Sequence, residues 1–410
     1  MRGDMDTGGW SRRRFVGALT GAAAAAALPA CNDAPPPTRS APSSASASPN
    51  TPEAAAGTPS EARSPGPHPL YLGTYTSAEG GGKGIGLATY DATTGRITDR
   101  GILAETGDPS FLALHPNGRT LYAVNEREDG GVTAVRLADR HVLGTRSSGG
   151  AGPCHLSVHP SGRWLLSANY NSGSVAVHPI AASGALGEHT DVVTHSSPPP
   201  GPDPERQDGP HTHQIVTTPD GVHVLAVDLG TDTVYTYRLD QAKGTLTEVS
   251  RARAKPGAGP RHLTFHPGGR YAYLANELDN TITVCAYDPA TGRLTIGDPE
   301  PTGTGEVTSY PSQILVTTDG SYAYFANRGH NSLTRYAIEA SGARVRLLDT
   351  VPVHGDWPRH TAFSPDGRLL FVSNQRSSSV TVFHVDRRSG ELRLAGEPFA
   401  SPVAVCALPL

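Results

Sequence analysis

One frame of residues returns six times along the chain, and this repetition limits the possible fold more than any other feature. Each copy contains an apolar stretch, a short turn, a second apolar stretch that ends in Asn or Asp, and a third apolar stretch. The turns, HPNGR, HPSGR, TPDGV, HPGGR, TTDGS and SPDGR, are anchored at Pro116, Pro160, Pro219, Pro267, Thr318 and Pro365. Gly, Asp and Pro in such turns join short antiparallel strands. Each copy therefore predicts one small antiparallel sheet.

The spacing of the copies predicts an all-β protein. A period of about 45 to 60 residues built from four strands is typical of a β-propeller. A seventh copy is split between the ends of the chain: LYLGTYTSAEGGGKGIGLATYDATTGRIT near Leu70 lacks a first strand, and the final PVAVCALPL carries Pro402 and Pro409 at the spacing of a first strand. We expect a seven-bladed β-propeller of four-stranded antiparallel blades over residues 68–410, closed by the C-terminal strand that completes the first blade. An open solenoid would leave its strand edges exposed.

The N-terminal segment has the features of an export signal. SRRRFVGALTGAAAAAALPAC places Arg12 and Arg13 before Phe15 and a short Ala-rich apolar run that ends at Cys31. This order resembles a twin-arginine signal, and the run is too short to span a membrane. The ending LPAC resembles a lipoprotein signal, in which Cys31 would be acylated. We expect residues 1–31 to direct export, with Cys31 as a candidate lipidation site; an unprocessed tail is the alternative.

Composition defines the next segment and excludes some classes of function. Residues 32–67 are almost all Ala, Pro, Ser, Thr and Gly, which bury too little apolar surface to fold, so we expect a disordered tether. The net charge is −4, and no segment is basic enough to bind the phosphate backbone of a nucleic acid. Cys154, Cys285 and Cys406 are too far apart for a CxxC pair. We expect a monomer that contacts a membrane only through a lipid anchor.

Two positions in the repeat change their residue from blade to blade, so they are candidates for a site. The first lies near the start of the first strand and holds Ser110, Cys154, His213, Arg261, Ser312, Arg359 and Val403. The second directly follows the Asn or Asp that ends the second strand and holds Glu126, Tyr170, Leu229, Glu277, Arg328 and Gln375. Inner strands of a propeller line one central channel, so these side chains are expected to converge on a shared mouth.

Such a mouth would combine His213, Arg261, Glu277 and Arg328, whose chemistry suits an anionic ester or lactone. Arginine presents a planar fork to a carboxylate, a phosphate or a developing oxyanion. Histidine and glutamate can activate water or return a proton to a leaving alcohol. No GxSxG, Walker or HExxH motif occurs, which argues against an acyl-enzyme, an NTPase and a zinc protease. The alternative is an Arg–Glu–Arg ion network that only holds the blades together.

Histidines occur at other places in the repeat. His155, His262 and His360 share the position after the first variable one, and we expect a packing role for His262 and His360, while His155 stays open between packing and binding. The connection SSPPPGPDPERQDGPHTHQI is longer than the others and brings Arg206 and Gln207 close to His211 and His213; long loops in compact folds often carry function. Alternate residues of a strand point to opposite faces, so His211 and His213 are not expected to share a metal ion. We expect no metal and no cofactor.

Four segments, RQDGPHTHQI, GPRHLTFHPGGRYAYLANELDNTITV, FANRGHNSLTRY and WPRHTAFSPDGRLLFVSNQRSSSVTVF, resemble the seven-bladed lactonase family. That family contains cycloisomerase-type 6-phosphogluconolactonases and fungal carboxymuconate lactonizing enzymes, and the resemblance runs from about Leu70 to the C-terminus. It implies a catalytic set of one His, two Arg and one Glu. Matched by motif, these residues are His213, Arg261, Arg328 and Glu277, and the substrate-binding candidates are His155, Arg206, Gln207, Arg359 and Gln375.

The resemblance implies a lactonase-like carboxylic ester hydrolase that acts on a small lactone or organic acid by general acid/base catalysis. The export signal distinguishes this chain from cytoplasmic members, and 6-phosphogluconolactone is an intracellular metabolite. The expected substrate is therefore an anionic sugar lactone or a related lactone outside the cytoplasm. The alternative is a non-catalytic binding propeller at the cell surface for a glycan, a peptide or a small acid.

Overall fold

The computed structural model describes residues 66–196 and 201–410. The predicted export signal with Cys31 and nearly all of the predicted tether lie outside these residues, so both stay predictions. Strands make up almost all of the regular structure, and one short 3-10 helix, η1, covers Ala340–Gly342. In the ranges described, no helix has the length and apolar character needed to cross a membrane.

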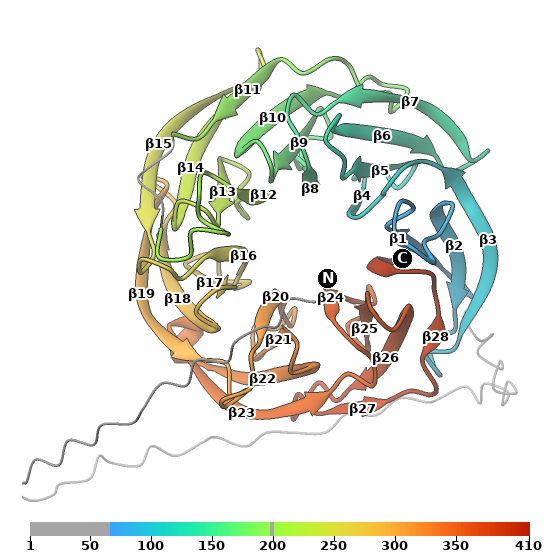
Figure 1. Ribbon diagram of the computed structural model, residues 1–410, viewed down its shortest axis with the longest axis vertical. Coiled ribbons are helices and arrows are strands. Elements are labelled where there is room, and N and C mark those ends of the chain that lie inside the picture. Colours follow the sequence, from blue (N-terminus) through green and yellow to red (C-terminus); the bar gives the residue numbers. More distant parts are fainter. Residues whose placement is uncertain (1–65, 197–200) are drawn as a thin grey trace, which may run out of the picture. The chain divides into compact units, whose positions relative to one another are not determined.

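The strands form seven antiparallel sheets arranged as blades around a central axis (Figure 1), which confirms the predicted propeller. Blade 1 contains β29 (Ala404–Pro409), β1 (His68–Thr74), β2 (Gly84–Tyr90) and β3 (Ile97–Glu105). Blade 2 contains β4 (Leu112–Leu114), β5 (Thr120–Asn125), β6 (Gly131–Arg136) and β7 (His141–Ser147). Blade 3 contains β8 (Pro153–Val158), β9 (Trp164–Asn169), β10 (Ser174–Pro179) and β11 (Asp191–Thr194).

The remaining blades follow the same order from the axis outward. Blade 4 contains β12 (Thr212–Thr217), β13 (His223–Asp228), β14 (Thr233–Asp240) and β15 (Thr245–Arg253). Blade 5 contains β16 (Pro260–Phe265), β17 (Tyr271–Asn276), β18 (Thr281–Asp288) and β19 (Arg293–Pro301). Blade 6 contains β20 (Tyr310–Val316), β21 (Tyr322–Arg328), β22 (Ser332–Glu339) and β23 (Arg344–Pro352). Blade 7 contains β24 (Pro358–Phe363), β25 (Leu369–Asn374), β26 (Ser379–Val385), β27 (Leu392–Leu394) and β28 (Phe399–Ala400).

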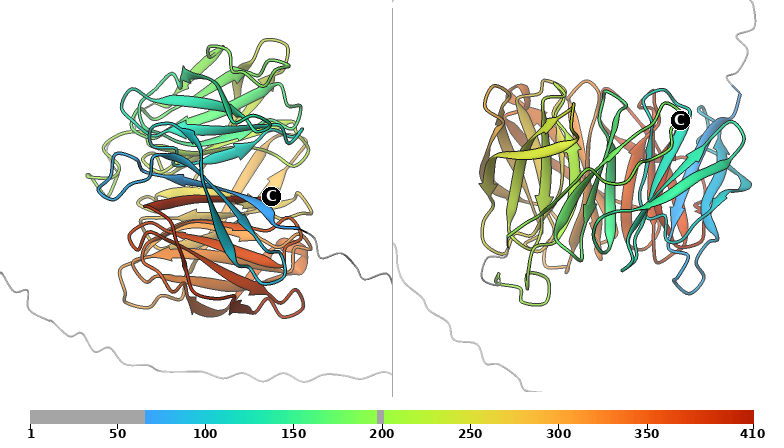
Figure 2. Two further views of the ribbon diagram at one scale, coloured as in Figure 1. Left: turned by 90° about the vertical axis from the view of Figure 1, so that its right-hand side faces the viewer. Right: turned by 90° about the horizontal axis from the view of Figure 1, so that it is seen from above.

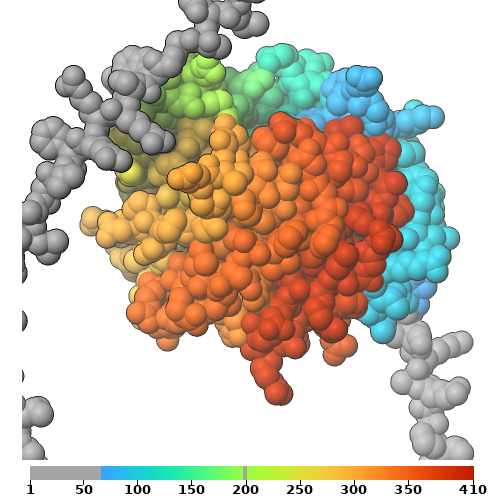
Figure 3. Space-filling view, turned by 60° about the horizontal axis from the view of Figure 1, so that its bottom comes forward, coloured from blue at the N-terminus to red at the C-terminus, as the bar shows by residue number. Residues whose placement is uncertain are grey.

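The two ends of the propeller close the ring in blade 1. Strand β29 pairs with β1 in antiparallel register, with Leu70 opposite Pro409 and Gly73 opposite Cys406. The red C-terminal part of the chain therefore lies directly beside the blue first blade (Figure 3). The C-terminal segment is the inner strand of the first blade, as the split seventh copy predicts. Because the ring is closed, both faces of every blade pack against a neighbouring blade.

The hydrophobic core lies between the blades. Seven clusters of buried apolar side chains each combine residues of two neighbouring blades. One example joins Leu225 and Val227 of blade 4 to Leu263 and Leu274 of blade 5. A β-strand buries alternate side chains on each face, and here both faces of every blade meet a neighbour. The ring therefore depends on all seven contacts together.

The inner strands are tied to one another by a side chain at the position that holds His155, His262 and His360. In blade 4 the Leu263 amide of the next blade donates to Gln214 Oε1 at 2.7 Å, and in blade 6 the Thr361 amide donates to Gln313 Oε1 at 2.8 Å. Histidine can accept the same backbone bond, but the bond is longer: the Ala407 amide lies 3.4 Å from His360 Nδ1. These bonds satisfy backbone groups at the inner edges of the sheets, which no strand covers.

Candidate active site

The first variable position coincides with a β-bulge in the inner strand. The register skips one residue between Pro153 and His155, between Thr212 and Gln214, between Pro260 and His262, and between Pro358 and His360. The residues left without an opposite partner are Cys154, His213, Arg261 and Arg359. A bulge re-aims a side chain out of the normal alternation of the strand. The repeated bulge is thus the local reason why these residues can reach the axis.

In blade 1 the register differs from the proline spacing of the sequence. Ala404 pairs with Thr74 and Cys406 with Gly73, so Val405 is the residue without an opposite partner. The predicted occupant, Val403, is therefore wrong by two residues. Prolines mark the turn geometry of the other blades, whereas hydrogen bonding to β1 decides the register of β29.

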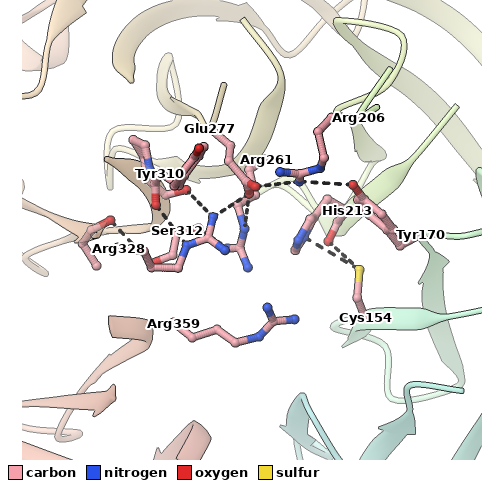
Figure 4. A network of polar contacts seen from close by, with 12 residues as sticks. Cys154, Tyr170, Arg206, His213, Arg261, Glu277, Tyr310, Ser312, Arg328 and Arg359 are labelled. Carbon is pink, nitrogen blue, oxygen red and sulfur yellow. Dashed lines mark hydrogen bonds and ion pairs between the residues drawn. The ribbon is translucent and has the colours of Figure 1, made fainter. Parts of the chain in front are cut away.

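Glu277 is the centre of a cluster of three arginines from two blades and one loop (Figure 4). Its Oε1 accepts a hydrogen bond from Arg206 Nη2 at 2.7 Å. Its Oε2 forms ion pairs with Arg261 Nε at 3.0 Å and with Arg328 Nη2 at 2.6 Å. The carboxylate is 3% exposed, and the side chains of Arg261 and Arg328 are 2% and 6% exposed. The structure brings Arg261, Glu277 and Arg328 together, as the two variable positions predict.

Backbone carbonyl groups of blade 6 hold two of the arginines. Arg261 Nη1 donates to the carbonyl of Ser312. Arg328 donates from Nε to the Tyr310 carbonyl at 2.9 Å and from Nη2 to the Pro311 carbonyl at 3.1 Å. These carbonyl bonds and the ion pairs with Glu277 fix the positions of both guanidinium groups.

His213 lies beside this cluster, on the side of blade 3. Its ring is 5.5 Å from that of Tyr170, whose hydroxyl accepts a hydrogen bond from Arg206 at 3.2 Å. Its Nδ1 atom lies 3.7 Å from the sulfur of Cys154, the bulge residue of blade 3. The imidazole is therefore linked to the Glu277 cluster through Tyr170 and Arg206, and Figure 4 shows it next to Arg261.

Arg359 forms a second, looser group with residues of blades 1 and 2. Its Nη2 lies 3.4 Å from both carboxylate oxygens of Glu126, and its guanidinium carbon lies 5.3 Å from the centre of the Tyr75 ring. Tyr75 also donates its hydroxyl proton to Glu126 at 2.9 Å. In Figure 4 the guanidinium of Arg359 faces the space between Arg261 and Cys154 and has no contact with the other residues drawn. Arg359 has the least engaged of these guanidinium groups.

Loops around the mouth come from one face of the ring. The blue loop that follows β1 and the green loop that leads into β12 extend from the same face (Figure 2, right). Tyr75 belongs to the first of these loops and Arg206 to the second. We call the end of the ring that carries Tyr75, Glu126, His213, Arg206, Arg261, Glu277, Arg328 and Arg359 the mouth.

Charge and burial determine the protonation of the mouth. Burial alone would raise the pKa of Glu277, but the charges of Arg328, Arg261 and Arg206 outweigh it and lower the pKa to about 2. Burial and the charge of Arg328 lower the pKa of Arg261 to about 9, so its guanidinium still carries its proton at neutral pH. Burial opposes the charge of Arg359 as well, but Tyr75 and Glu126 raise its pKa.

The imidazole of His213 is held in its neutral form. Burial lowers its pKa well below 6.5, and the charges of Arg261, Arg359 and Arg328 lower it further. His213 is therefore neutral at physiological pH, with one ring nitrogen able to accept a proton. Burial also raises the pKa of the Cys154 thiol, so this sulfur stays protonated.

Beneath the mouth, the histidines of the repeated position pack around Phe111. The ring of Phe111 lies 4.2 Å from His155, 5.3 Å from His360 and 6.4 Å from His262, and His155 lies 5.4 Å from His262. All three imidazoles are nearly inaccessible to solvent. Burial, followed by the nearby His360 and Arg261, lowers the pKa of His155 to about 3, and burial with Arg261 and Arg359 does the same for His360.

These neutral histidines should make the fold sensitive to acid. An unfolded histidine has a pKa near 6.5, so between about pH 6.5 and pH 3 the unfolded chain binds more protons than the folded one. By linkage, each such histidine lowers the free energy of unfolding by about 1.4 kcal/mol for every unit by which the pH falls in this window. Denaturant unfolding at pH 7.5, 6.5, 5.5 and 4.5 measures this slope.

The matched variant is His360→Gln, because Gln214 and Gln313 fill this position in blades 4 and 6 and accept the same backbone bond. We expect it to reduce the slope by about one proton below pH 6.5. An unchanged slope would contradict a neutral, buried His360.

Two other predicted binding residues, Gln207 and Gln375, form no side-chain hydrogen bond with the Glu277 cluster. Gln207 is buried, and its amide donates to the Leu229 carbonyl at 3.0 Å, so its side chain supports the loop. The backbone N–H of Gln375 donates to the Trp357 carbonyl at 3.0 Å, and its side-chain Oε1 is buried without a hydrogen bond from the residues described. Within residues 66–196 and 201–410, no three His, Cys, Asp or Glu side chains are grouped to hold a metal ion.

Sequence reasoning missed two aromatic residues at the mouth. Tyr75 directly follows β1, so it fills in blade 1 the second variable position, but the long loop after it hides the repeat. Trp357 lies 5.6 Å from the guanidinium of Arg328 and 3.5 Å from that of Arg376. Its φ of 65° is left-handed, and glycine takes the same position in blades 3 and 5, where Gly152 and Gly259 have φ of 61° and 59°. A non-glycine residue is strained there, and only the backbone angles reveal it.

Comparison with known proteins identifies the family of this chain. Residues 69–409 match the family described as "Lactonase, 7-bladed beta-propeller". The 6-phosphogluconolactonase of Bacillus subtilis is 34% identical over 343 residues, which cover 82% of this chain and 96% of that protein. A protein of Lactobacillus plantarum of known crystal structure is 36% identical, with a TM-score of 0.78 over 84% of this chain and 99% of that one.

A second solved structure is that of a periplasmic gluconolactonase of Pseudomonas aeruginosa, which is 30% identical with a TM-score of 0.77 over 84% of this chain and 99% of that one. The family match spans nearly the whole propeller, and the relatives are matched almost over their full length. The chain belongs to the seven-bladed β-propeller lactonase family.

Proposed function

We propose that the protein is an exported lactone hydrolase that opens an anionic sugar lactone or a related lactone at the mouth of the propeller. The observation that carries the proposal is the buried Glu277 carboxylate with Arg206, Arg261 and Arg328 around it, next to the neutral imidazole of His213. Among the described residues, four guanidinium groups at the mouth are ion-paired with two carboxylates, those of Glu126 and Glu277. This excess of positive charge favours an anionic substrate.

His213 is the better candidate for the general base. A carboxylate with a pKa of about 2 takes up almost no protons at neutral pH, so Glu277 keeps the arginines in place and does not transfer protons. His213 is neutral, but the arginines make it a weak base. An anionic group bound between Arg261, Arg328 and Arg359 would offset their charge and raise the pKa of His213 toward the operating pH. Binding of an anion thus activates the base.

Hydrolysis then needs one water molecule and one proton relay. His213 takes a proton from water as the hydroxide attacks the lactone carbonyl carbon, and the carbonyl oxygen becomes an oxyanion. The guanidinium groups of Arg261 and Arg359 stabilise this negative charge. When the carbonyl re-forms, the bond to the ring oxygen breaks, and the protonated His213 returns its proton to that oxygen. The products are a hydroxy acid and the unchanged enzyme.

Turnover of a panel of lactones tests the proposal. We expect the protein to hydrolyse δ-gluconolactone and 6-phosphoglucono-δ-lactone, with the higher kcat/KM for the phosphorylated compound. A pH-stat measures the reaction through the proton that the product acid releases. His213→Asn should lower kcat/KM by about 10² to 10⁴-fold, the range for loss of a general base. Saturable calorimetric binding of these compounds without turnover would instead identify a binding propeller. Full activity of His213→Asn would reject His213 as the base.

Export rests on residues outside the described ranges. The order of Arg12, Arg13, the apolar run and Cys31 supports a twin-arginine signal with a lipid anchor. The periplasmic location named for the relative from Pseudomonas aeruginosa supports it as well. Mass spectrometry of the mature protein from its own host should find a chain that starts at an acylated Cys31. A chain that retains residues 1–30 would reject export by this route.

A further inference from the structure

Blade 4, which carries His213, departs from its neighbours at two scaffold positions. In four blades a proline of the inner strand pairs with the Asn that ends the second strand: Pro153 with Asn169, Pro260 with Asn276, Pro311 with Asn327 and Pro358 with Asn374. In blade 4 the same pair is Thr212 and Asp228. Thr212 adds a hydroxyl group where the other blades have proline, and Asp228 has a carboxylate, which only accepts, where they have an amide.

In blades 5 and 7 the Asn donates within its own blade, whereas Asn125 and Asn169 also donate to the Gly107 and Ser148 carbonyls of the connections that enter their blades. The Asn276 amide donates to Thr281 and Thr283 on the third strand at 2.9 and 3.0 Å, and the Asn374 amide donates to Thr381 at 2.9 Å. A carboxylate cannot donate these bonds. Asp228 therefore accepts hydrogen bonds at a position where its counterparts donate them.

Asp228 accepts hydrogen bonds from both ends of the connection between blades 3 and 4 and from the turn that follows β13. Its side chain is fully buried, and Oδ2 accepts from His195 Nδ1 at 2.6 Å and from the Thr212 hydroxyl at 3.0 Å. Its Oδ1 accepts from the backbone amides of His211 at 2.9 Å and Thr231 at 3.0 Å. Burial would raise the pKa of this carboxyl, but the bond and charge of His195 outweigh it, with help from the amides, and lower the pKa. Asp228 is thus a fully bonded anion.

His195 is held as firmly as its partner. Its Nε2 lies 2.9 Å from the Tyr237 hydroxyl, and its ring stacks on Tyr235 with 3.8 Å between the ring centres. The side chain is 1% exposed. A buried pair with every polar atom bonded is rigid, and it has no access to a ligand.

The position of this pair in the chain connects it to the mouth. His195 is where the connection from blade 3 begins, and His211 and Thr212 are where it ends, so Asp228 binds both ends. The described part between them carries Arg206, which bonds to Glu277 and Tyr170. His213 follows Thr212 directly. Arg206 is the one cluster arginine of the mouth that a loop, and not a strand, supplies.

We propose that Asp228 and His195 are positioning residues of the mouth, which clamp both ends of the connection into blade 4 and thereby hold Arg206 and His213 in place. The inference rests on the proposed function and extends it to two residues that do not touch the substrate. It also explains why blade 4 alone, among the blades compared, has Thr and Asp at this pair of positions.

Asp228→Asn is the decisive variant, because Asn ends the second strand in five other blades and the blade should still fold. We expect kcat/KM for the lactone to fall by about 10 to 100-fold with a change of only a few degrees in melting temperature. The control is Thr381→Val, which removes the bond that the corresponding residue Asn374 makes within blade 7, and it should leave kcat/KM within about twofold. Equal losses in both variants would reject a specific role.

A double-mutant cycle separates positioning from general weakening. If Asp228 acts through the loop, Arg206→Ala should lower kcat/KM about 10-fold or more in the wild type but less than about threefold in the Asp228→Asn background. The same cycle with Arg359→Ala, which blade 7 supplies, should be additive. Additive effects in the Arg206 cycle would overturn the proposal. Should Asp228→Asn fail to fold, His195→Gln takes its place in both cycles.

A readout without turnover keeps the two proposals distinguishable. Hydrogen–deuterium exchange of the amides of residues 201–211 should increase at least about 10-fold in Asp228→Asn and stay unchanged in Thr381→Val. If the wild type hydrolyses no lactone, the proposed function fails, and the clamp is judged by this exchange and by calorimetric binding of 6-phosphogluconate. Unchanged exchange together with unchanged binding or turnover overturns the clamp alone.

Discussion

Replacing Glu277 with glutamine should lower kcat/KM for an anionic lactone by about 10² to 10³-fold, the usual effect of disturbing groups that stabilise charge in the transition state. The carboxylate holds Arg206, Arg261 and Arg328 within 2.6 to 3.0 Å. A glutamine presents an amide donor to guanidinium groups that are themselves only donors. The arginines would then repel one another without their common partner and leave the geometry needed for an oxyanion.

The same change should reduce stability, because it removes one partner of a buried ion network. Such a loss costs about 3 to 5 kcal/mol, so activity is to be measured at a temperature where circular dichroism shows the variant to be folded. The matched control is Asp349→Asn, which breaks the bidentate pair with Arg335 in blade 6 at 2.5 and 2.6 Å. We expect the control to retain activity.

The outcome separates the two interpretations of the Arg–Glu–Arg cluster. Loss of activity in the folded Glu277→Gln protein, with the control active, supports a functional site. Full activity combined with a lower melting temperature would mean that the cluster only holds the blades together.

Removing residues 404–410 should abolish the cooperative fold of the propeller. Strand β29 supplies the inner strand of blade 1, and Ala404, Val405, Cys406 and Ala407 are fully or almost fully buried. Without it, β1 keeps β2 but loses its inner partner strand, and blade 1 loses apolar contacts with blades 2 and 7. Large truncations in a core destabilise by more than the few kcal/mol that a domain has in reserve.

Thermal unfolding followed by circular dichroism, together with size-exclusion chromatography, measures this effect. All strands of the seven described sheets lie within residues 68–409. The control therefore removes residues 1–65 and should melt within a few degrees of the full-length protein. A truncated protein without residues 404–410 that still melts cooperatively near the wild-type temperature would contradict ring closure by β29.

The number and order of the blades could be read from the sequence because each blade repeats the same local chemistry. Turns at Pro116, Pro160 and their counterparts impose antiparallel strands wherever they occur. Residues that vary between repeats, such as Arg261 and Glu277, stand out against this background. Convergence at one mouth then follows from the closed ring, without knowledge of any side-chain contact.

Other features depend on register and on loops, which local patterns do not determine. Val403 was predicted where the pairing with β1 places Val405, because hydrogen bonds between strands distant in sequence decide the register. The bond from Arg206 to Glu277 depends on the path of a loop. The partnership of Asp228 with His195 joins residues that are 33 positions apart.

The sequence by itself determined the all-β class, the seven blades and the closure by the C-terminal strand, and it singled out the charged residues and His213 at the mouth but not Tyr75. Periodic apolar residues and turn residues act locally, so they predict strands and turns from the sequence alone. Only the tertiary structure decided that Glu277 is bonded to three arginines, that Arg359 faces the mouth with few partners, and that His213 is neutral. Those properties arise from burial and from charges a few ångströms apart, and both exist only when the blades are packed together.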